Sequence, residues 1–186
     1  MLTPTQKTLV QSTFAMVAPI ADEAAQLFYR RLFELDPSLQ RMFRGDMAEQ
    51  RKKLMQMLTA AVKGLDHVDR LVPVIQELGR RHATYGVLDQ HYNTVGAALL
   101  WALEKGLGDA FTPEVREAWA AVYGFIARKM SEAARETRIE ALISSARPSR
   151  QEVRAKATVA TAPSFHAARI LPSAANVSAT TAPCPE

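Results

Sequence analysis

The chain has 186 residues, of which 48% are hydrophobic and 23% charged, a composition typical of one globular domain with room for a tail. Its single cysteine, Cys184, excludes an internal disulfide, and the four histidines are too scattered for a structural zinc site. The first 144 residues hold 18 basic and 17 acidic side chains, and the last 42 hold 5 and 2. The net charge of +4 therefore comes largely from the C-terminal end, and no nucleic-acid-binding face is expected on the folded part.

The first 42 residues predict three helical segments. Thr3-Pro4-Thr5-Gln6 combines a capping threonine, a proline in the first turn and a glutamine three residues after the threonine, as in a capping box. Pro19 predicts a break or a new first turn. Apolar residues then recur at threes and fours over 24–35, and Asp36-Pro37 ends that helix and begins a short one over 38–42.

The rest of the folded part predicts four more helices. The first spans about 47–63 and the next, shorter, about 71–83. Asp89 is expected to cap a long helix that ends near residue 107, and Thr112-Pro113-Glu114 begins the last, which fades near residue 140. With no strand pattern and no internal repeat, the chain predicts an all-α domain of six or seven helices.

The composition changes from Ser145 onwards. Of the last 42 residues, 25 are Ala, Ser, Thr or Pro, and no apolar period persists, as is typical of a disordered extension. We expect a domain over 1–140 and a disordered basic tail rich in Ala, Ser and Pro over 141–186, with contact to an anionic surface as the alternative. No apolar run reaches 18 residues and no secretory signal pattern is found, so no membrane span is expected and the expected compartment is the cytoplasm.

The motifs of common enzyme classes are absent from the sequence, including the P-loop, the Rossmann glycines, G-x-S-x-G, H-E-x-x-H and C-x-x-C. The histidines remain as candidates for chemistry. His82 ends the helix predicted over 71–83, where a lone histidine is more often a surface residue than a ligand. His67, in the connection after Gly64, is expected to be solvated.

Three other features accompany His82. Tyr29 interrupts an apolar stretch, Phe43 stands alone after the short helix, and Gln50 and Leu54 lie four residues apart, hence on one helix face. Taken singly, each has a plain structural interpretation: a tyrosine at the core edge, a core phenylalanine and a solvated glutamine.

Taken together and in this order, these residues resemble the bacterial single-domain haemoglobins and the related haem domain of flavohaemoglobins, over about residues 1–135. The resemblance implies a globin fold, with six to eight helices around a haem pocket, and haem b as the cofactor. The matching segments are Phe28-Tyr29, Asp36-Pro37, Phe43, Gln50, Leu54, Leu78-Gly79-Arg80-Arg81-His82, Tyr85-Gly86-Val87, His91-Tyr92, Val95-Gly96, Leu99-Leu100, Ala118-Trp119 and Val122-Tyr123-Gly124.

The resemblance also implies a role for each matching residue. His82 would be the proximal ligand of the haem iron. Tyr29 and Gln50 would be the catalytic pair, a hydroxyl and an amide that donate hydrogen bonds to O₂ in the distal pocket. The other cofactor contacts would be Phe43 flat on the porphyrin, Leu54 over the iron, Arg81 at a haem propionate and Tyr92 near the proximal histidine.

One position departs from the flavohaemoglobin pattern. Where those proteins have a glutamate that completes a His–Tyr–Glu network, this chain has Ala134, with Glu132 and Glu136 two residues to either side and turned by about 200°. The departure argues against a strongly electron-rich proximal side. His91 is expected to be exposed or near a propionate, and Gln50 stands where a second histidine ligand would be needed.

The implied function is O₂ binding. Two distal hydrogen-bond donors are expected to slow O₂ release, which favours NO dioxygenation or scavenging over oxygen transport. A separate reductase or electron donor would be needed, because 186 residues leave no room for flavin and nicotinamide modules. The alternatives are a haem-based gas sensor or carrier that docks to a partner through its tail, and a helical module without a cofactor. The oligomeric state is left open.

Overall fold

A computed structural model describes residues 2–146, and within that range the regular structure is entirely helical. Residues 1 and 147–186 lie outside the described range, and so does most of the tail expected over 141–186. The division into a domain and a disordered tail therefore stays a prediction. The α-helices are α1 (Pro4–Val17), α2 (Ala21–Leu35), α3 (Met47–Lys63), α4 (Val68–Thr84), α5 (Asp89–Leu107) and α6 (Pro113–Ala146), and the connections hold the 3-10 helices η1 (Ala18–Ile20), η2 (Pro37–Met42), η3 (Gly64–His67) and η4 (Gly108–Ala110).

Several helix boundaries are as the sequence predicts. The Thr3 hydroxyl accepts the Gln6 backbone N–H at 3.2 Å, and the Gln6 side chain accepts the Thr3 N–H at 2.9 Å, so the capping box at the start of α1 is confirmed. Pro19 lies in η1, which separates α1 from α2. The bounds of α3 and α5 match the predicted 47–63 and 89–107.

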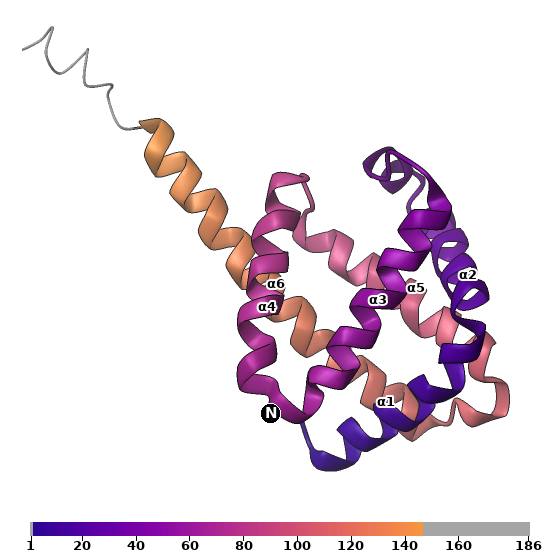
Figure 1. Ribbon diagram of the computed structural model, residues 1–186. Coiled ribbons are helices and arrows are strands. Elements are labelled where there is room, and N and C mark those ends of the chain that lie inside the picture. The colour runs from indigo at the N-terminus through magenta and orange to yellow at the C-terminus, as the bar shows by residue number, and fades with distance from the viewer. Residues whose placement is uncertain (1, 147–186) are drawn as a thin grey trace, which may run out of the picture. The chain divides into compact units, whose positions relative to one another are not determined.

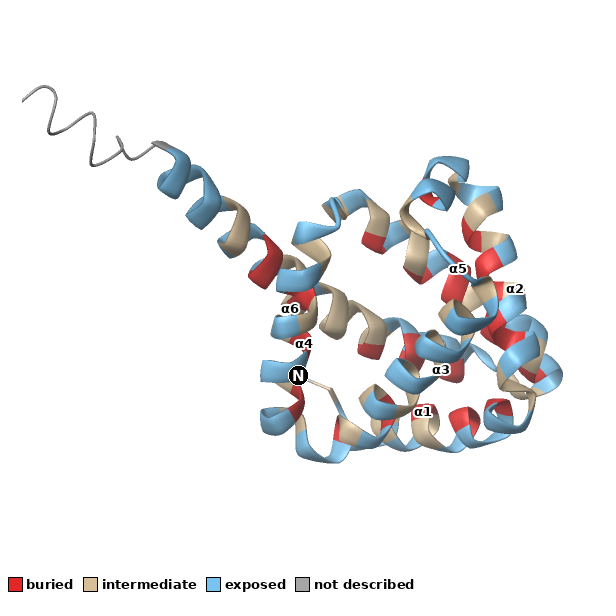
Figure 2. Cartoon of the chain, turned by 45° about the horizontal axis from the view of Figure 1, so that its top comes forward, coloured by how far each residue is buried: buried red, intermediate tan, exposed pale blue. Residues whose placement is uncertain are grey.

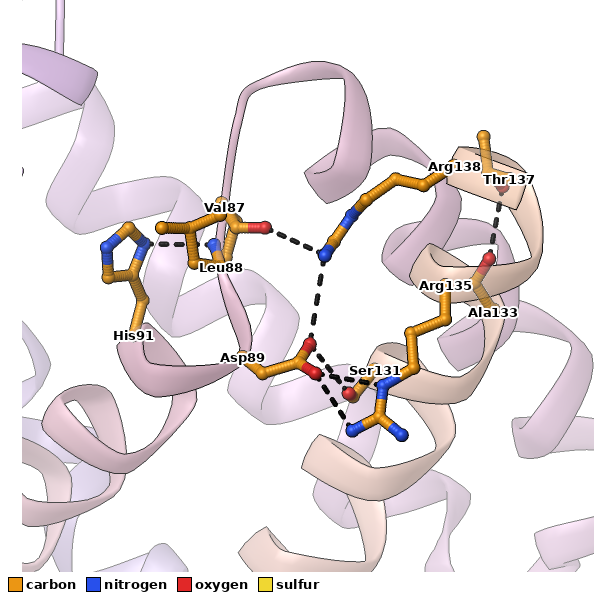
Figure 3. Close-up of polar contacts among 9 residues, drawn as sticks. All are labelled: Val87, Leu88, Asp89, His91, Ser131, Ala133, Arg135, Thr137 and Arg138. Carbon is orange, nitrogen blue, oxygen red and sulfur yellow. Dashed lines mark hydrogen bonds and ion pairs between the residues drawn. The ribbon is translucent and has the colours of Figure 1, made fainter. Parts of the chain in front are cut away.

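Asp89 does not cap α5, contrary to the prediction. The N-cap residue is Leu88, whose backbone N–H donates to Nδ1 of His91 at 3.1 Å. The carboxylate of Asp89 instead reaches across to α6, where it accepts from Ser131 at 3.0 Å and pairs with Arg135 at 2.8 Å (Figure 3). The carboxylate of Asp89, which the local sequence pattern predicts to cap α5, is thus bound by side chains of α6.

The last helix also runs further than predicted. α6 continues to Ala146, past the expected fading near residue 140. Arg138 ties the C-terminal third of α6 to the connection before α5, because its guanidinium donates to the Val87 carbonyl at 3.0 Å (Figure 3). Beyond that point α6 extends past the neighbouring helices, and Ile139, Leu142 and Ile143 are exposed (Figures 1 and 2).

The core is built where α6 crosses α4 and α1 and where α2 packs on α5. α4 packs mainly on α6, α2 on α5, and α1 on α6. At the α1–α6 crossing the buried indole N–H of Trp119 donates to the Thr13 hydroxyl at 3.0 Å, which satisfies a polar pair inside the core. No helix within residues 2–146 is long and apolar enough to cross a membrane.

Gly79 sets the close approach of α4 to α6. A Cβ atom at Gly79 would lie 2.7 Å from the Cα of Met130 and closer still to its carbonyl oxygen. Both contacts are with backbone, which cannot rotate away, so the two helices would have to separate.

We therefore expect Gly79→Ala to lower the free energy of unfolding by about 1–3 kcal/mol, as over-packing of a core does. Urea unfolding of the full chain measures this change. Gly124→Ala is the matched control, because a Cβ there meets only the far end of Arg128 at 3.6 Å and alanine favours a helix by up to about 1 kcal/mol. Equal destabilisation by both substitutions would contradict the close approach.

Candidate functional site

His82 lies in the last turn of α4 and is partly buried. Its Nδ1 is 2.8 Å from the carbonyl oxygen of Leu78. Because a carbonyl only accepts hydrogen bonds, Nδ1 carries the proton and Nε2 keeps its lone pair. Burial lowers the pKa of His82 from its ordinary value, and the hydrogen bond to Leu78 offsets only part of that effect. The imidazole is therefore neutral and has one free nitrogen, the form that binds transition metals.

No other donor set in the described part of the chain suits a metal ion held by protein alone. Among residues 2–146, no group of three or more His, Cys, Asp and Glu side chains converges on one point. Within the described residues, His82 therefore has no partner side chains that would complete a metal site with it.

Tyr29 lies in an aromatic cluster, called here the Tyr29 cluster, which is made of Phe28, Tyr29, Phe33 and Phe43. The Tyr29 ring centroid is 5.1 Å from that of Phe28, 5.9 Å from Phe33 and 5.3 Å from Phe43. Phe43 caps the C-terminal end of η2, so the turn after this short helix places its ring against α2. The structure thus brings Tyr29 and Phe43 together, as one site requires.

The hydroxyl of Tyr29 points to the start of α3. It donates to the backbone oxygen of Gln50 at 3.3 Å, a long and hence weak hydrogen bond. Burial raises the pKa of Tyr29 to about 12. The phenol therefore stays protonated near neutral pH and keeps its donor hydrogen. Gln50 and Leu54 follow one another on one face of α3, and both are partly buried.

α3 and α4 leave apolar surface incompletely covered. α3 packs on α2 and α1 while α4 packs on α6, and α3 with α4 is not among the helix pairs in extensive contact. Leu54 and Leu58 on α3, and Leu78 on α4, are only half-buried against the core. Half-buried leucines on two helices that do not close on each other are what a large apolar cofactor between them would cover.

Tyr92 carries a buried hydroxyl for which the described residues provide no hydrogen-bond partner. Burial raises its pKa. Its backbone oxygen accepts from the Tyr123 hydroxyl, but no carboxylate reaches the Tyr92 hydroxyl. Ala134 is fully buried, and Glu132 pairs with Lys129 at 2.7 Å. Among the described residues, no carboxylate is therefore a partner of the Tyr92 hydroxyl, and the effect of Ala134 on the proximal side stays a prediction.

Arg81 is not brought to the other candidates. Its side chain is 64% exposed and pairs with Glu77 at 3.3 Å on the surface of α4. Such exposed pairs stabilise little, so the guanidinium is free to turn to another anion. Contact of Arg81 with a propionate stays a prediction. His91 lies in the first turn of α5, where its Nδ1 accepts the backbone N–H of Leu88.

Sequence reasoning missed Phe33 as a member of the Tyr29 cluster. The signal was present, because Phe33 follows Tyr29 by four residues and so shares its helix face. It also missed the burial of the Tyr123 side chain against Gly96, where an added Cβ would lie 2.6 Å from the tyrosine ring. That contact lies between α5 and α6, and no local sequence pattern predicts it.

Comparison with known proteins is consistent across sequence and structure. Residues 26–130 match the family model Globin. The chain is 32% identical over 124 residues to a flavohemoprotein of Bacillus subtilis, covering 64% of this chain and 31% of the relative. It is 33% identical over 133 residues to a flavohemoprotein of Deinococcus radiodurans, covering 70% and 33%. The chain thus spans about a third of the length of these relatives.

A solved structure is similar in fold. It is a hexacoordinated heme protein from an anhydrobiotic tardigrade, crystallised at pH 4. The TM-score is 0.66 at 22% identity, covering 72% of this chain and 96% of the other. At this level of identity the likeness concerns the fold alone.

Proposed function

The chain belongs to the globin family, and from that premise we propose that it binds haem b through His82 and acts in O₂ and NO chemistry. The observation that carries the proposal is the state of His82: Nδ1 donates to the Leu78 carbonyl and Nε2 remains free. A metal-ligating histidine is normally oriented in this way, by a hydrogen bond from its other ring nitrogen. The fold and the chemistry of this one side chain support the same cofactor.

The other residues fit a haem as well. Leu54, Leu58 and Leu78 offer half-buried apolar surface on α3 and α4, suited to a porphyrin. Phe43 would contribute its ring to the same surface. Arg81 would exchange Glu77 for a propionate, and Tyr92 would lie on the side of His82.

A bound haem would supply an iron centre at which O₂ binds and reacts with NO. The protein itself would contribute the hydrogen-bond donors and the apolar side chains around that centre. Tyr29 donates through a hydroxyl that stays protonated, since its pKa is about 12, and its long bond to the Gln50 carbonyl is easily given up for a closer acceptor. The Gln50 amide would be the second donor. Phe28, Phe33 and Phe43 surround the ring of Tyr29, and a hydrogen bond donated from such apolar surroundings is stronger than one in water.

The proximal side is proposed to be less electron-rich than in flavohaemoglobins. His82 donates to a neutral carbonyl, and a buried methyl group stands at Ala134. Without a carboxylate, the imidazole stays neutral and donates less charge to a metal ion. Because dioxygenation leaves the haem iron ferric, turnover is expected to depend on a reductase or other electron donor, which we propose acts with the protein in the cytoplasm.

The test is a two-step measurement on the full chain. Haemin added to purified protein is expected to give an intense Soret band. The reduced, oxygenated protein mixed with NO in a stopped-flow instrument is expected to give nitrate and ferric haem in one-to-one yield. Failure to bind haemin would overturn the whole proposal. Haem binding without nitrate would overturn NO dioxygenation and favour gas binding alone.

A further inference from the structure

The backbone of His82 is bonded to the connection that follows α4. Residues 85–88 join the end of α4 to the start of α5. The carbonyl oxygen of His82 accepts two hydrogen bonds from this connection, from the Tyr85 N–H at 3.2 Å and from the Val87 N–H at 3.1 Å. Gly86, between these two donors, has a φ of 79°, a conformation that glycine adopts without strain. A displacement of the connection would therefore be transmitted to the last turn of α4.

A side chain of α6 holds the same connection from the other side. The guanidinium of Arg138 donates to the carbonyl oxygen of Val87 at 3.0 Å (Figure 3). Both backbone groups of Val87 are thus engaged, because its N–H donates to His82 and its carbonyl accepts from Arg138. Val87 is therefore a one-residue link between α6 and His82.

Arg138 is itself held in place by Asp89, at the start of α5. The guanidinium and the carboxylate are 3.8 Å apart, and the same carboxylate accepts from the Ser131 hydroxyl at 3.0 Å and from Nε of Arg135 at 2.9 Å (Figure 3). An exposed ion pair alone would stabilise little, but this carboxylate is bound by three side chains of one helix. The forked guanidinium can meet a carbonyl and a carboxylate together, so Arg138 joins Asp89 to Val87.

The group of Asp89, Arg135 and Arg138 also lies near Tyr92. Tyr92 follows Asp89 by three residues, so the two side chains share one side of the first turn of α5. Burial raises the pKa of Tyr92, and the charges of Arg138 and Asp89 act on that pKa in opposite directions. The contacts of Arg138 thus adjoin two candidate residues, the backbone of His82 and the side chain of Tyr92.

We propose that Arg138 is a positioning residue for His82: through Val87 it fixes the last turn of α4, and with it the direction in which Nε2 of His82 points. The inference rests on the proposed function, in which Nε2 binds the haem iron. A carboxylate on Nδ1 would orient the ring from a separate element, whereas here Nδ1 donates to Leu78 of the same helix. The direction of the ring therefore depends on how firmly the end of α4 is held, and Arg138 supplies that constraint from α6.

Amide hydrogen exchange in the full chain, as purified, tests the contact between Arg138 and Val87. Arg138→Gln is expected to speed exchange of the Val87 amide about 5-fold or more, because a hydrogen bond that keeps the connection closed is weakened. Arg138→Lys, which keeps a charged donor, is expected to restore most of the protection. Lys129→Gln is the matched control, since Lys129 is a cation of α6 that pairs with Glu132 of the same helix at 2.7 Å. Exchange at Val87 as slow in Arg138→Gln as in the unchanged chain would overturn the proposal.

Resonance Raman spectroscopy of the ferrous, haem-loaded protein tests the positioning itself, because the iron–histidine stretching band reports on the bond between iron and imidazole. Arg138→Gln is expected to shift and broaden this band, because the ring is held less uniformly, while Arg138→Lys and Lys129→Gln leave it close to that of the unchanged chain. An unaltered band together with faster Val87 exchange would overturn the positioning role. Lack of the band in the unchanged chain as well would overturn the proposed function, and the exchange result would still report on the contact.

Discussion

Replacing His82 by alanine is expected to abolish stable haem binding. Removal of a residue that only orients a metal ligand already costs about 10–100-fold in affinity, and here the ligand itself would be lost. The measurement is transfer of haem to excess apomyoglobin, followed by the Soret band. His67→Ala is the matched control, because His67 is an exposed histidine in η3. Equal haem transfer from the two variants would show that His82 is not the ligand.

Binding of haem by His82 is expected to depend on pH in a defined direction. Burial lowers the pKa of His82, so the neutral form persists to lower pH than in an unfolded chain. Haem binding is expected to hold as the pH falls through about 6.5, the ordinary histidine value, and to weaken only below it. The unfolded chain takes up a proton there more readily than the folded one, so stability also declines in that range. A titration of the Soret band in the native protein measures the midpoint, and a midpoint above 6.5 would contradict this ordering.

Tyr29→Phe is expected to raise the O₂ dissociation rate about 10- to 100-fold, the effect of losing a hydrogen bond of about 1.5–3 kcal/mol to an acceptor with charge. CO, a poorer acceptor, should change much less. Stopped-flow displacement of O₂ by CO measures the rate in the haem-loaded protein.

Tyr85→Phe provides the control, because Tyr85 is 67% exposed and lies beside His82 rather than in the Tyr29 cluster. If O₂ and CO rates rise together in Tyr29→Phe, the residue acts by shape and not by donating a hydrogen bond.

Helix boundaries follow closely from local signals in this chain. Thr3, Pro19 and Asp36 act through their own backbone neighbourhood, which is why their positions predict where helices begin and end. Asp89 shows the limit. Its position predicts a cap, yet two arginines and a serine of α6 bind the carboxylate, and no local rule places those partners beside it.

The candidate site could likewise be predicted from the sequence only in part. Tyr29, Phe43, Gln50 and His82, together with the other matching segments, carry the resemblance that indicated the family. That the rings of Tyr29 and Phe43 touch, that Nδ1 of His82 is the protonated nitrogen and that the Tyr92 hydroxyl has no partner among the described residues all depend on the folded backbone.

The hydrogen bond between Trp119 and Thr13 has a consequence for synthesis of the protein. It joins residues 106 positions apart, so the part of the apolar face of α1 that packs on α6, including Phe14 beside Trp119, stays uncovered on the ribosome until α6 has been made. Chains interrupted before residue 119 would keep that apolar surface exposed and would be expected to aggregate or to be bound by chaperones and degraded by proteases. The first helix to be translated therefore completes its packing only after the last helix has been translated.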